Sequence, residues 1–386
     1  MKIVAANIFV VPVGNRTGVI LELETDQGIS GLGEAGIAYG MGTEATAAMV
    51  AQLVQSVVLG QNPGPVELIW SNLYERGYWT KGGGAITSAA MSAIEVALWD
   101  IKGKALGVPV YSLFGGPFRD KIDTYANGWW MGCETAQDFA KAGQRAVEAG
   151  ARGLKLYPLG LMDPETVIRH PIRRRVDPGL LELAVGRVRE LRAAVGPGVD
   201  ILLDLGGGLH ADQMRPLLRR LAHFDVGFAE EPMDPGAPDA LRNLDRPIPC
   251  AAGERVYMRY GFHRLLGTGA VDILQPDICN VGGLAEARRI AAMGEVHNTS
   301  VSPHNYGTTL ASVIAVQFSA SIPNFRSLEI FPDFHLEPGY IPLIDQPVEQ
   351  MLDQGRLPLP QGAGLGVSLR RSDVEGRLWR RIEGAG

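Results

Sequence analysis

The chain has 386 residues, of which 46% are hydrophobic and 20% charged, and this composition predicts a large folded core rather than a disordered chain. Lys and Arg number 36 against 42 Asp and Glu, and the resulting net charge of −6 argues against a nucleic-acid partner, which would need a basic face. Because no apolar run is long enough to cross a bilayer and the three cysteines are widely spaced, we expect a cytoplasmic protein without membrane association or disulfides.

The first 117 residues predict an α+β domain. Extended apolar runs occupy Ile3–Val13, Gly18–Glu24 and Ile29–Glu34, and helical spacing then follows at Thr43–Leu59 and Ser88–Leu106. Strands followed by helices within one block are typical of an α+β unit.

Beyond residue 117 the pattern changes to short apolar runs that alternate with amphipathic segments. The eight runs are Ile122–Ala126, Gly153–Tyr157, Asp200–Leu205, Val226–Glu231, Ile248–Glu254, Val271–Asp277, Thr299–His304 and Phe325–Ile330. Eight successive strand–helix units predict a (β/α)8-type barrel over residues 118–332. A doubly wound α/β sheet is the alternative, although it rarely needs eight evenly spaced strands. Residues 333–386 are rich in Pro and Gly, and we expect them to pack back on the N-terminal domain and complete it.

A long loop, from Pro158 to Pro178, follows the second barrel strand and shows no clear periodicity. A loop of this length in a compact domain is usually functional or disordered. It would overhang the active-site face of the barrel, so His170 and Arg173 within it are candidate substrate contacts.

Polar or ionisable residues stand where the predicted barrel strands end. They are Lys155, Tyr157, Asp204, Glu230, Glu254, Asp277, His304 and Glu329. From Asp204 to Glu329 the spacings are 23–27 residues, one strand–helix unit each. The carboxyl ends of parallel barrel strands meet at one rim, so these side chains should surround a single pocket.

Three of these residues, Asp204, Glu230 and Glu254, are carboxylates on successive strands. At pocket distances they would repel one another strongly without a cation. An all-oxygen set suits a hard cation, Mg²⁺ first and Mn²⁺ second. The alternative is that each acid pairs with a neighbouring Lys or Arg or caps a helix, and the regular spacing favours the metal. Glu231 alternates with Glu230 along the strand, so only one of the two should face the metal.

Candidate proton-transfer groups lie on two sides of this ring. Asp277 and His304 end adjacent strands, and a carboxylate beside an imidazole suits a general acid/base. Opposite them, a buried Lys155 beside a metal would have a depressed pKa and could act as a base, or it could remain charged and hold a substrate carboxylate. Tyr157 should face the same side. This arrangement predicts removal of the proton α to a carboxylate, with a metal stabilising the enediolate charge.

In these motifs the sequence resembles the enolase superfamily, in its mandelate racemase/muconate lactonizing enzyme group, over almost the whole chain. The residues that carry the resemblance are Ala97-Leu98-Trp99-Asp100-Ile101-Lys102-Gly103-Lys104, Leu113-Phe114-Gly115-Gly116, Lys155-Leu156-Tyr157, Asp204, Phe228-Ala229-Glu230-Glu231-Pro232, Gly253-Glu254, Gln275-Pro276-Asp277 and Pro303-His304. Each motif is weak alone, but the combination is specific.

The resemblance implies an enolase-like modified TIM barrel beneath an N-terminal capping domain, assembled into a homo-oligomer between dimer and octamer. It implies Mg²⁺ held by Asp204, Glu230 and Glu254, the Asp277–His304 dyad as general acid/base, and Glu329 as a group that hydrogen-bonds the substrate carboxylate. Capping loops near Val13–Gly18 and Gly77–Gly84 would close the pocket, which makes Arg16 and Trp79 further candidate substrate contacts.

Two departures from the family pattern matter. The usual second-strand motif is Lys-x-Lys, whose second Lys is a base, and here that position is Tyr157. This argues against a two-base racemase, although a tyrosinate beside Lys155 could serve. Many relatives carry Asn or His where this chain has Gly206, and His210 is a possible substitute.

The leading functional hypothesis is dehydration of an acid sugar, an aldonate or aldarate, to a 2-keto-3-deoxy acid. The alternative within the same chemistry is a racemase, an epimerase or a lactone-forming or lactone-opening cycloisomerase. A metal-dependent hydrolase would normally place several His at the strand ends, and this ring has one. A non-catalytic sugar-acid binding protein would not need an acid/base dyad beside three carboxylates.

Overall fold

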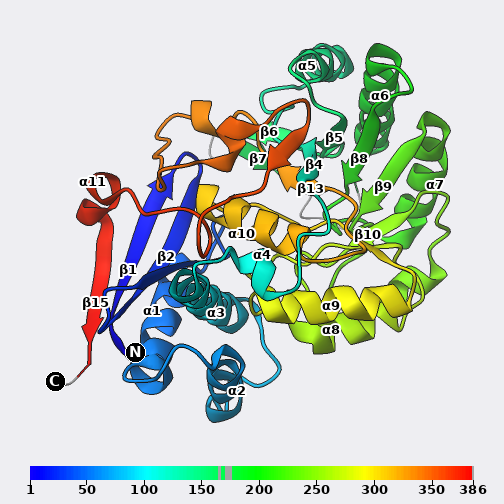
Figure 1. The fold of residues 1–386 in the computed structure, drawn as a ribbon. Coiled ribbons are helices and arrows are strands. Elements are labelled where there is room, and N and C mark those ends of the chain that lie inside the picture. Colours follow the sequence, from blue (N-terminus) through cyan, green and yellow to red (C-terminus); the bar gives the residue numbers. More distant parts are fainter. Residues whose placement is uncertain (164–166, 170–175, 385–386) are drawn as a thin grey trace.

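The computed structural model describes residues 1–163, 167–169 and 176–384, so the predicted substrate contacts His170 and Arg173 lie outside the described residues. Figure 1 shows an N-terminal layer of sheet and helices beside a barrel of parallel strands. In the part of the chain that the structure describes, no helix is both long and apolar enough to span a membrane.

The N-terminal sheet has four antiparallel strands in the order β15-β1-β2-β3. Their bounds are β1 Ile3–Val13, β2 Arg16–Thr25, β3 Ser30–Ala35 and β15 Leu378–Glu383. A two-residue turn joins β1 to β2, with Val13 paired to Arg16 and Gly14 at a φ of 60°, a conformation that glycine adopts without strain. The first three strands were predicted, whereas β15 was not distinguished within the Pro- and Gly-rich tail.

Helices cover this sheet, and α3 is the most buried of them. Their bounds are α1 Thr43–Leu53 with a π-helical extension η1 Val54–Val58, α2 Val66–Arg76, α3 Ala85–Leu106 and α4 Val110–Leu113. Two strand glycines let α3 approach β3 closely, since a Cβ on Gly33 would stand 2.0 Å from the Ala93 carbonyl oxygen. The sequence predicted α1 and α3 but missed α2.

The barrel contains all eight predicted strands in the order β12-β11-β10-β9-β8-β5-β4-β13. Their bounds are β4 Lys121–Ala126, β5 Gly153–Leu156, β8 Asp200–Asp204, β9 Val226–Glu230, β10 Cys250–Ala252, β11 Ile273–Leu274, β12 Ser300–Val301 and β13 Leu328–Ile330. A parallel bridge between Val301 and Phe325 joins the two ends of this order and closes the ring. Strands β11 and β12 are shorter than predicted because Pro276 and Pro303, which lack a backbone N–H, follow them.

The connections follow the predicted alternation with two differences. The bounds are α5 Ala136–Glu148, α6 Pro178–Val195, α7 Ala211–Leu221 with η2 Ala222–Phe224, η3 Pro238–Asn243, α8 Met258–Leu266, α9 Leu284–Val296 and α10 Thr309–Ala320. The fourth connection is a 3₁₀ helix, and only a short 3₁₀ turn, η4 Phe334–Leu336, follows the eighth strand. The loop after β5 is not wholly irregular, because β6 Leu161–Asp163 pairs with β7 Val167–Arg169.

The C-terminal segment contacts both parts of the molecule. It contains η5 Val348–Met351, β14 Arg356–Pro358, α11 Arg371–Val374 and η6 Glu375–Arg377 before β15. Strand β15 pairs with β1 of the N-terminal sheet, beside it in Figure 1, whereas β14 pairs with β4 of the barrel. The boundaries at residues 117 and 332 therefore stay a prediction, since the tail is shared between the two units.

Two buried acids of the N-terminal domain cap barrel helices. Glu95 on α3 accepts hydrogen bonds from the backbone N–H groups of Leu284 (2.7 Å) and Ala285 (2.9 Å) at the start of α9. Glu34 on β3 accepts from the N–H groups of Thr308 (2.8 Å) and Ala311 (3.0 Å) at the start of α10. Helix N-termini leave such donors without intrahelical partners, so these carboxylates join the two domains.

These two acids predict a stability that falls with rising pH. Burial raises the pKa of Glu95 to about 8 and that of Glu34 to about 7, both above the value of the unfolded chain. At a pH between the unfolded and the folded pKa of each acid, the folded protein holds a proton that the unfolded chain has released. The free energy of unfolding therefore decreases as pH rises through this range.

We expect urea denaturation to show that the free energy of unfolding falls less between pH 5.5 and pH 8 in Glu95→Gln than in the unchanged protein. The control is Glu148→Gln, which changes an exposed acid on α5. An equal pH dependence in all three proteins would contradict a protonation linked to Glu95.

Candidate active site

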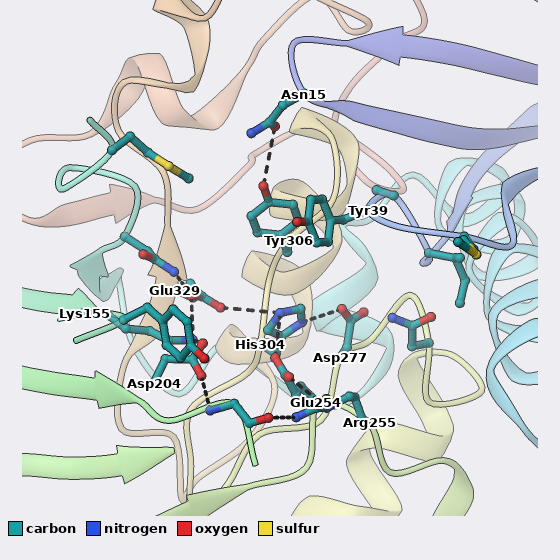
Figure 2. A pocket seen from close by; sticks show the side chains of 18 of the residues that line it. Asn15, Tyr39, Lys155, Asp204, Glu254, Arg255, Asp277, His304, Tyr306 and Glu329 are labelled. Atoms are coloured by element: carbon teal, nitrogen blue, oxygen red, sulfur yellow. Dashed lines mark hydrogen bonds and ion pairs between the residues drawn. The ribbon is translucent and has the colours of Figure 1, made fainter. Parts of the chain in front are cut away.

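The strand ends of the barrel open into a cavity of about 600 Å³ (Figure 2). The predicted site residues that line it are Lys155, Tyr157, Asp204, Glu254, Asp277, His304 and Glu329. Glu230 lies beneath them, fully buried, and contacts Lys155. The structure thus brings the predicted ring together in one place.

Lys155 is the positive centre of this ring. It lies on β5 with only 1% of its surface exposed, and its Nζ is 2.7 Å from Glu230, 3.0 Å from Glu329 and 3.6 Å from Asp204. Burial lowers its pKa, but these three carboxylates outweigh burial and raise the pKa well above its usual value. In the absence of a metal ion the pKa of Lys155 is thus raised rather than depressed, which favours the charged side chain over a base.

His304 and Asp277 form the predicted dyad. The Nδ1 of His304 is 2.7 Å from Asp277 Oδ2, and its Nε2 faces the pocket, 3.2 Å from Glu254. Asp277 is itself held by the N–H of Cys279 at 2.8 Å. Burial lowers the pKa of His304, but the charge of Glu254 and the bond to Asp277 raise it to about 10. In the absence of a metal ion, these acids therefore favour the protonated imidazole.

Glu329 connects the two sides of the ring. One of its oxygens accepts hydrogen bonds from Lys155 and, at 2.8 Å, from Asn127, and the other accepts from the N–H of Asn305 at 3.1 Å. Burial raises the pKa of Glu329, but Lys155 and His304 lower it below its usual value. An ionised Glu329 repels another carboxylate, so its implied hydrogen bond to a substrate carboxylate stays a prediction that needs a protonated form.

The three predicted metal ligands are each paired with a protein cation in this structure. Glu230 and Asp204 face Lys155, while Glu254 lies between His304 and Arg255, whose Nε is 3.3 Å away. Among the described residues no group of three or more Asp, Glu, His or Cys side chains is arranged to hold a metal ion.

The chemistry of these side chains nevertheless fits a hard cation. Buried Glu230 Oε1 has no hydrogen-bond partner within the described residues, and the three predicted ligands are all carboxylates, the oxygen ligands that a hard cation prefers. Burial raises the pKa of Glu230 to about 8; Lys155 opposes this, whereas Asp204 and Glu254 add to it. Negative charge is thus in excess. Glu231 forms a short ion pair with Arg255, consistent with only one member of the Glu230–Glu231 pair facing a metal.

Tyr157 and Gly206, the two departures from the family pattern, lie next to each other. A Cβ on Gly206 would stand 3.3 Å from the Tyr157 hydroxyl and 3.4 Å from its ring, so a side chain there would crowd the aromatic ring, and the φ of 59° at this position also favours glycine. Burial and the charge of Asp204 raise the pKa of Tyr157 well above its usual value, which contradicts the suggested tyrosinate. His210 is exposed just before α7, outside the residues that line the cavity, and does not replace the missing side chain.

Two predicted substrate contacts lie elsewhere. Trp79 is 92% exposed and does not line the cavity, and Arg16 is buried behind Tyr306 rather than in the cavity wall. The N-terminal domain reaches the cavity instead through Asn15 and through residues 37–41, including Tyr39. The contact through residues 37–41 was not predicted, because this Gly-rich stretch carries no periodic pattern.

The comparisons with known proteins agree with this geometry. Residues 138–374 match the family described as enolase C-terminal domain-like, and residues 4–115 match the mandelate racemase/muconate lactonizing enzyme N-terminal domain. The chain belongs to the mandelate racemase/muconate lactonizing enzyme group of the enolase superfamily. It is an enzyme of this group, a lyase or an isomerase, and the predicted modified TIM barrel with a capping domain is confirmed.

Relatives of this group cover nearly the whole chain. A D-galactonate dehydratase of Ralstonia pickettii is 32% identical over 95% of both chains, and a D-galactarolactone cycloisomerase of Agrobacterium fabrum is 32% identical over 92% of this chain and 90% of its own. A candidate dehydratase from Mesorhizobium loti superposes with a TM-score of 0.94 at 41% identity, covering 99% of this chain and 100% of its own. An enolase from Agrobacterium radiobacter, solved with bound Na and L-malate, has a TM-score of 0.86 at 29% identity, covering 100% and 97%.

Proposed function

We propose that this enzyme catalyses the Mg²⁺-dependent dehydration of an acid sugar, an aldonate or aldarate, to a 2-keto-3-deoxy acid. The observation that carries the proposal is the position of His304, whose Nε2 faces a cavity lined by carboxylates while Asp277 holds its Nδ1. The galactonate and gluconate dehydratases among its relatives support the same reaction class.

The residues of the chain suggest one proton-transfer group. Lys155 is held as a cation by three acids and Tyr157 by burial as a neutral phenol, so His304 is the group that takes the α-proton. The electron pair of the broken C–H bond then forms a C=C bond as the β-hydroxyl departs. The protonated imidazole returns its proton to that hydroxyl, which leaves as water, and the enol product becomes the 2-keto acid.

Asp204, Glu230 and Glu254 would hold the Mg²⁺, with Mn²⁺ as the second choice. Bound Mg²⁺ would supply positive charge that offsets Glu254 and stabilises the charge developing on the substrate carboxylate. Lys155 adds positive charge on the opposite side of the ring from His304. The substrate is a small carboxylate, and the homo-oligomer and the cytoplasmic location stay predictions.

The test is a panel of aldonates and aldarates, including galactonate, gluconate and galactarate, incubated with the purified protein and Mg²⁺. We expect 2-keto acid to form from at least one member and to disappear when the metal is chelated. Exchange of the α-hydrogen with solvent deuterium without loss of water would instead support an epimerase. Interconversion of an acid and its lactone would support the cycloisomerase alternative.

A further inference from the structure

Arg16 occupies an unusual position at the tip of the N-terminal domain. It begins β2 directly after the turn Gly14–Asn15, which projects to the mouth of the cavity, where Asn15 lines the wall. Arg16 itself is only 4% exposed, although it lies at the end of the two central strands of its sheet. A buried guanidinium at a hairpin tip requires a specific environment to hold its charge.

That environment is a cage of three aromatic rings supplied by the barrel and the C-terminal segment. The guanidinium carbon lies 4.2 Å from the ring centroid of Tyr306, 4.2 Å from that of Phe331 and 3.9 Å from that of Phe334. One further bond, from its Nη1 to the Gly307 carbonyl oxygen at 2.5 Å, fixes the orientation. Arg16 Nε and Nη2 have no hydrogen-bond partner among the described residues, so the three rings are the close contacts of the guanidinium, and the buried Glu349 is an acid that interacts with its charge.

The cage connects the hairpin to the catalytic loop. Tyr306 follows His304 by two residues, lines the cavity, and donates its hydroxyl to Asn15 Oδ1 at 3.5 Å. Its ring edge also meets Tyr39, from the second loop of the N-terminal domain, with centroids 5.6 Å apart. Figure 2 shows Tyr306 and Tyr39 side by side above His304, with Asn15 above Tyr306, whereas Asp204 lies below. Polar groups of both domains therefore meet around the ring that Arg16 contacts.

We propose that Arg16 is a positioning residue that fastens the β1–β2 turn to the Tyr306 ring and so builds the part of the pocket that binds the polyhydroxy chain of the substrate. Asn15 and Tyr306 present neutral hydrogen-bonding groups there, which suit hydroxyls rather than a charged group. His304 has an independent support in Asp277, so loss of Arg16 affects substrate binding more than proton transfer.

The first test measures amide hydrogen exchange and does not depend on the proposed function. In Arg16→Met, amides of residues 11–18 and 302–308 should exchange about 30-fold faster together, while those of the β4 strand stay protected. Arg16→Lys should restore part of the protection, because a Lys keeps the charge over the rings. The control is Arg380→Met, which changes an exposed arginine on β15.

Phe334→Leu removes the ring closest to Arg16 and does not change the cavity lining. It replaces Arg16→Met in the exchange experiment if that variant fails to fold. It should loosen the same two segments. Unchanged exchange in both segments, or a uniform increase across the whole chain, would overturn the proposal.

The second test rests on the proposed function and uses whichever acid sugar is turned over. Arg16→Met should raise KM about 10-fold with kcat changed by less than about 2-fold, and Arg16→Lys should recover part of the loss. A fall in kcat at unchanged KM would contradict a role in binding the sugar chain. Failure of every acid sugar would reject the proposed function while leaving the exchange result to decide the role of Arg16.

Discussion

Replacement of His304 by Asn is expected to lower kcat by about 100- to 10,000-fold, with the fold and Mg²⁺ binding nearly unchanged. Asn has no titrating nitrogen, so it cannot take the α-proton, yet its small polar side chain can remain near Asp277. The three carboxylates proposed to hold the metal are untouched by this change. Steady-state kinetics on the acid sugar identified by the panel measures turnover, and titration calorimetry measures Mg²⁺ binding.

The matched control for this variant is His263→Asn, which alters an exposed histidine on α8 that does not line the cavity. Its kcat should equal that of the unchanged enzyme. Full activity in His304→Asn would show that another group removes the proton, and the Asp277–His304 assignment would then be wrong.

Replacement of Lys155 by Met is expected to lower the free energy of unfolding by about 3–5 kcal/mol in the metal-free protein. Met keeps most of the side-chain volume but removes the charge that Glu230, Glu329 and Asp204 share. Buried carboxylates left without that partner repel one another. The pKa of Lys155 is higher in the folded protein than in the unfolded chain, so its charge contributes fully to the free energy of unfolding below about pH 10. Denaturation at pH 8 therefore measures the full contribution.

Two further measurements separate this cause from a loss of packing. The loss should shrink at pH 5, where the carboxylates left behind take up protons more readily, and also on addition of Mg²⁺. Lys141→Met, on the exposed face of α5, should leave stability unchanged. If Lys155→Met lost the same free energy of unfolding at both pH values, with and without the metal, the cause would be poorer packing rather than the missing charge.

Much of this fold could be predicted because its periodic signals are local. Each barrel strand lies within a short apolar run of the sequence, and the structure contains all eight. The strands of the tail could not be predicted in the same way. They depend on pairing partners that are distant in sequence, as β15 shows through its pairing with β1.

In the site, too, the positions of the strand-end side chains could be predicted but their interactions could not. The spacing of the strand ends was enough to predict that Lys155 and His304 line one cavity, but it did not predict their pKa values. The pKa of Lys155 depends on three acids within 3.6 Å, and their combined effect exceeds that of burial. Arg16 was expected in the cavity because its turn faces the cavity mouth, and only the positions of three aromatic rings show that it points elsewhere.

The pairing of β15 with β1 has a consequence for biosynthesis. Residues 5 and 383 are partners in one sheet, so a ribosome must make almost the entire chain before that sheet can be completed. Until then β1 has an open edge, the kind of surface on which nascent chains pair with the wrong neighbour. Slow maturation and a need for chaperones at high expression are therefore to be expected of this enzyme.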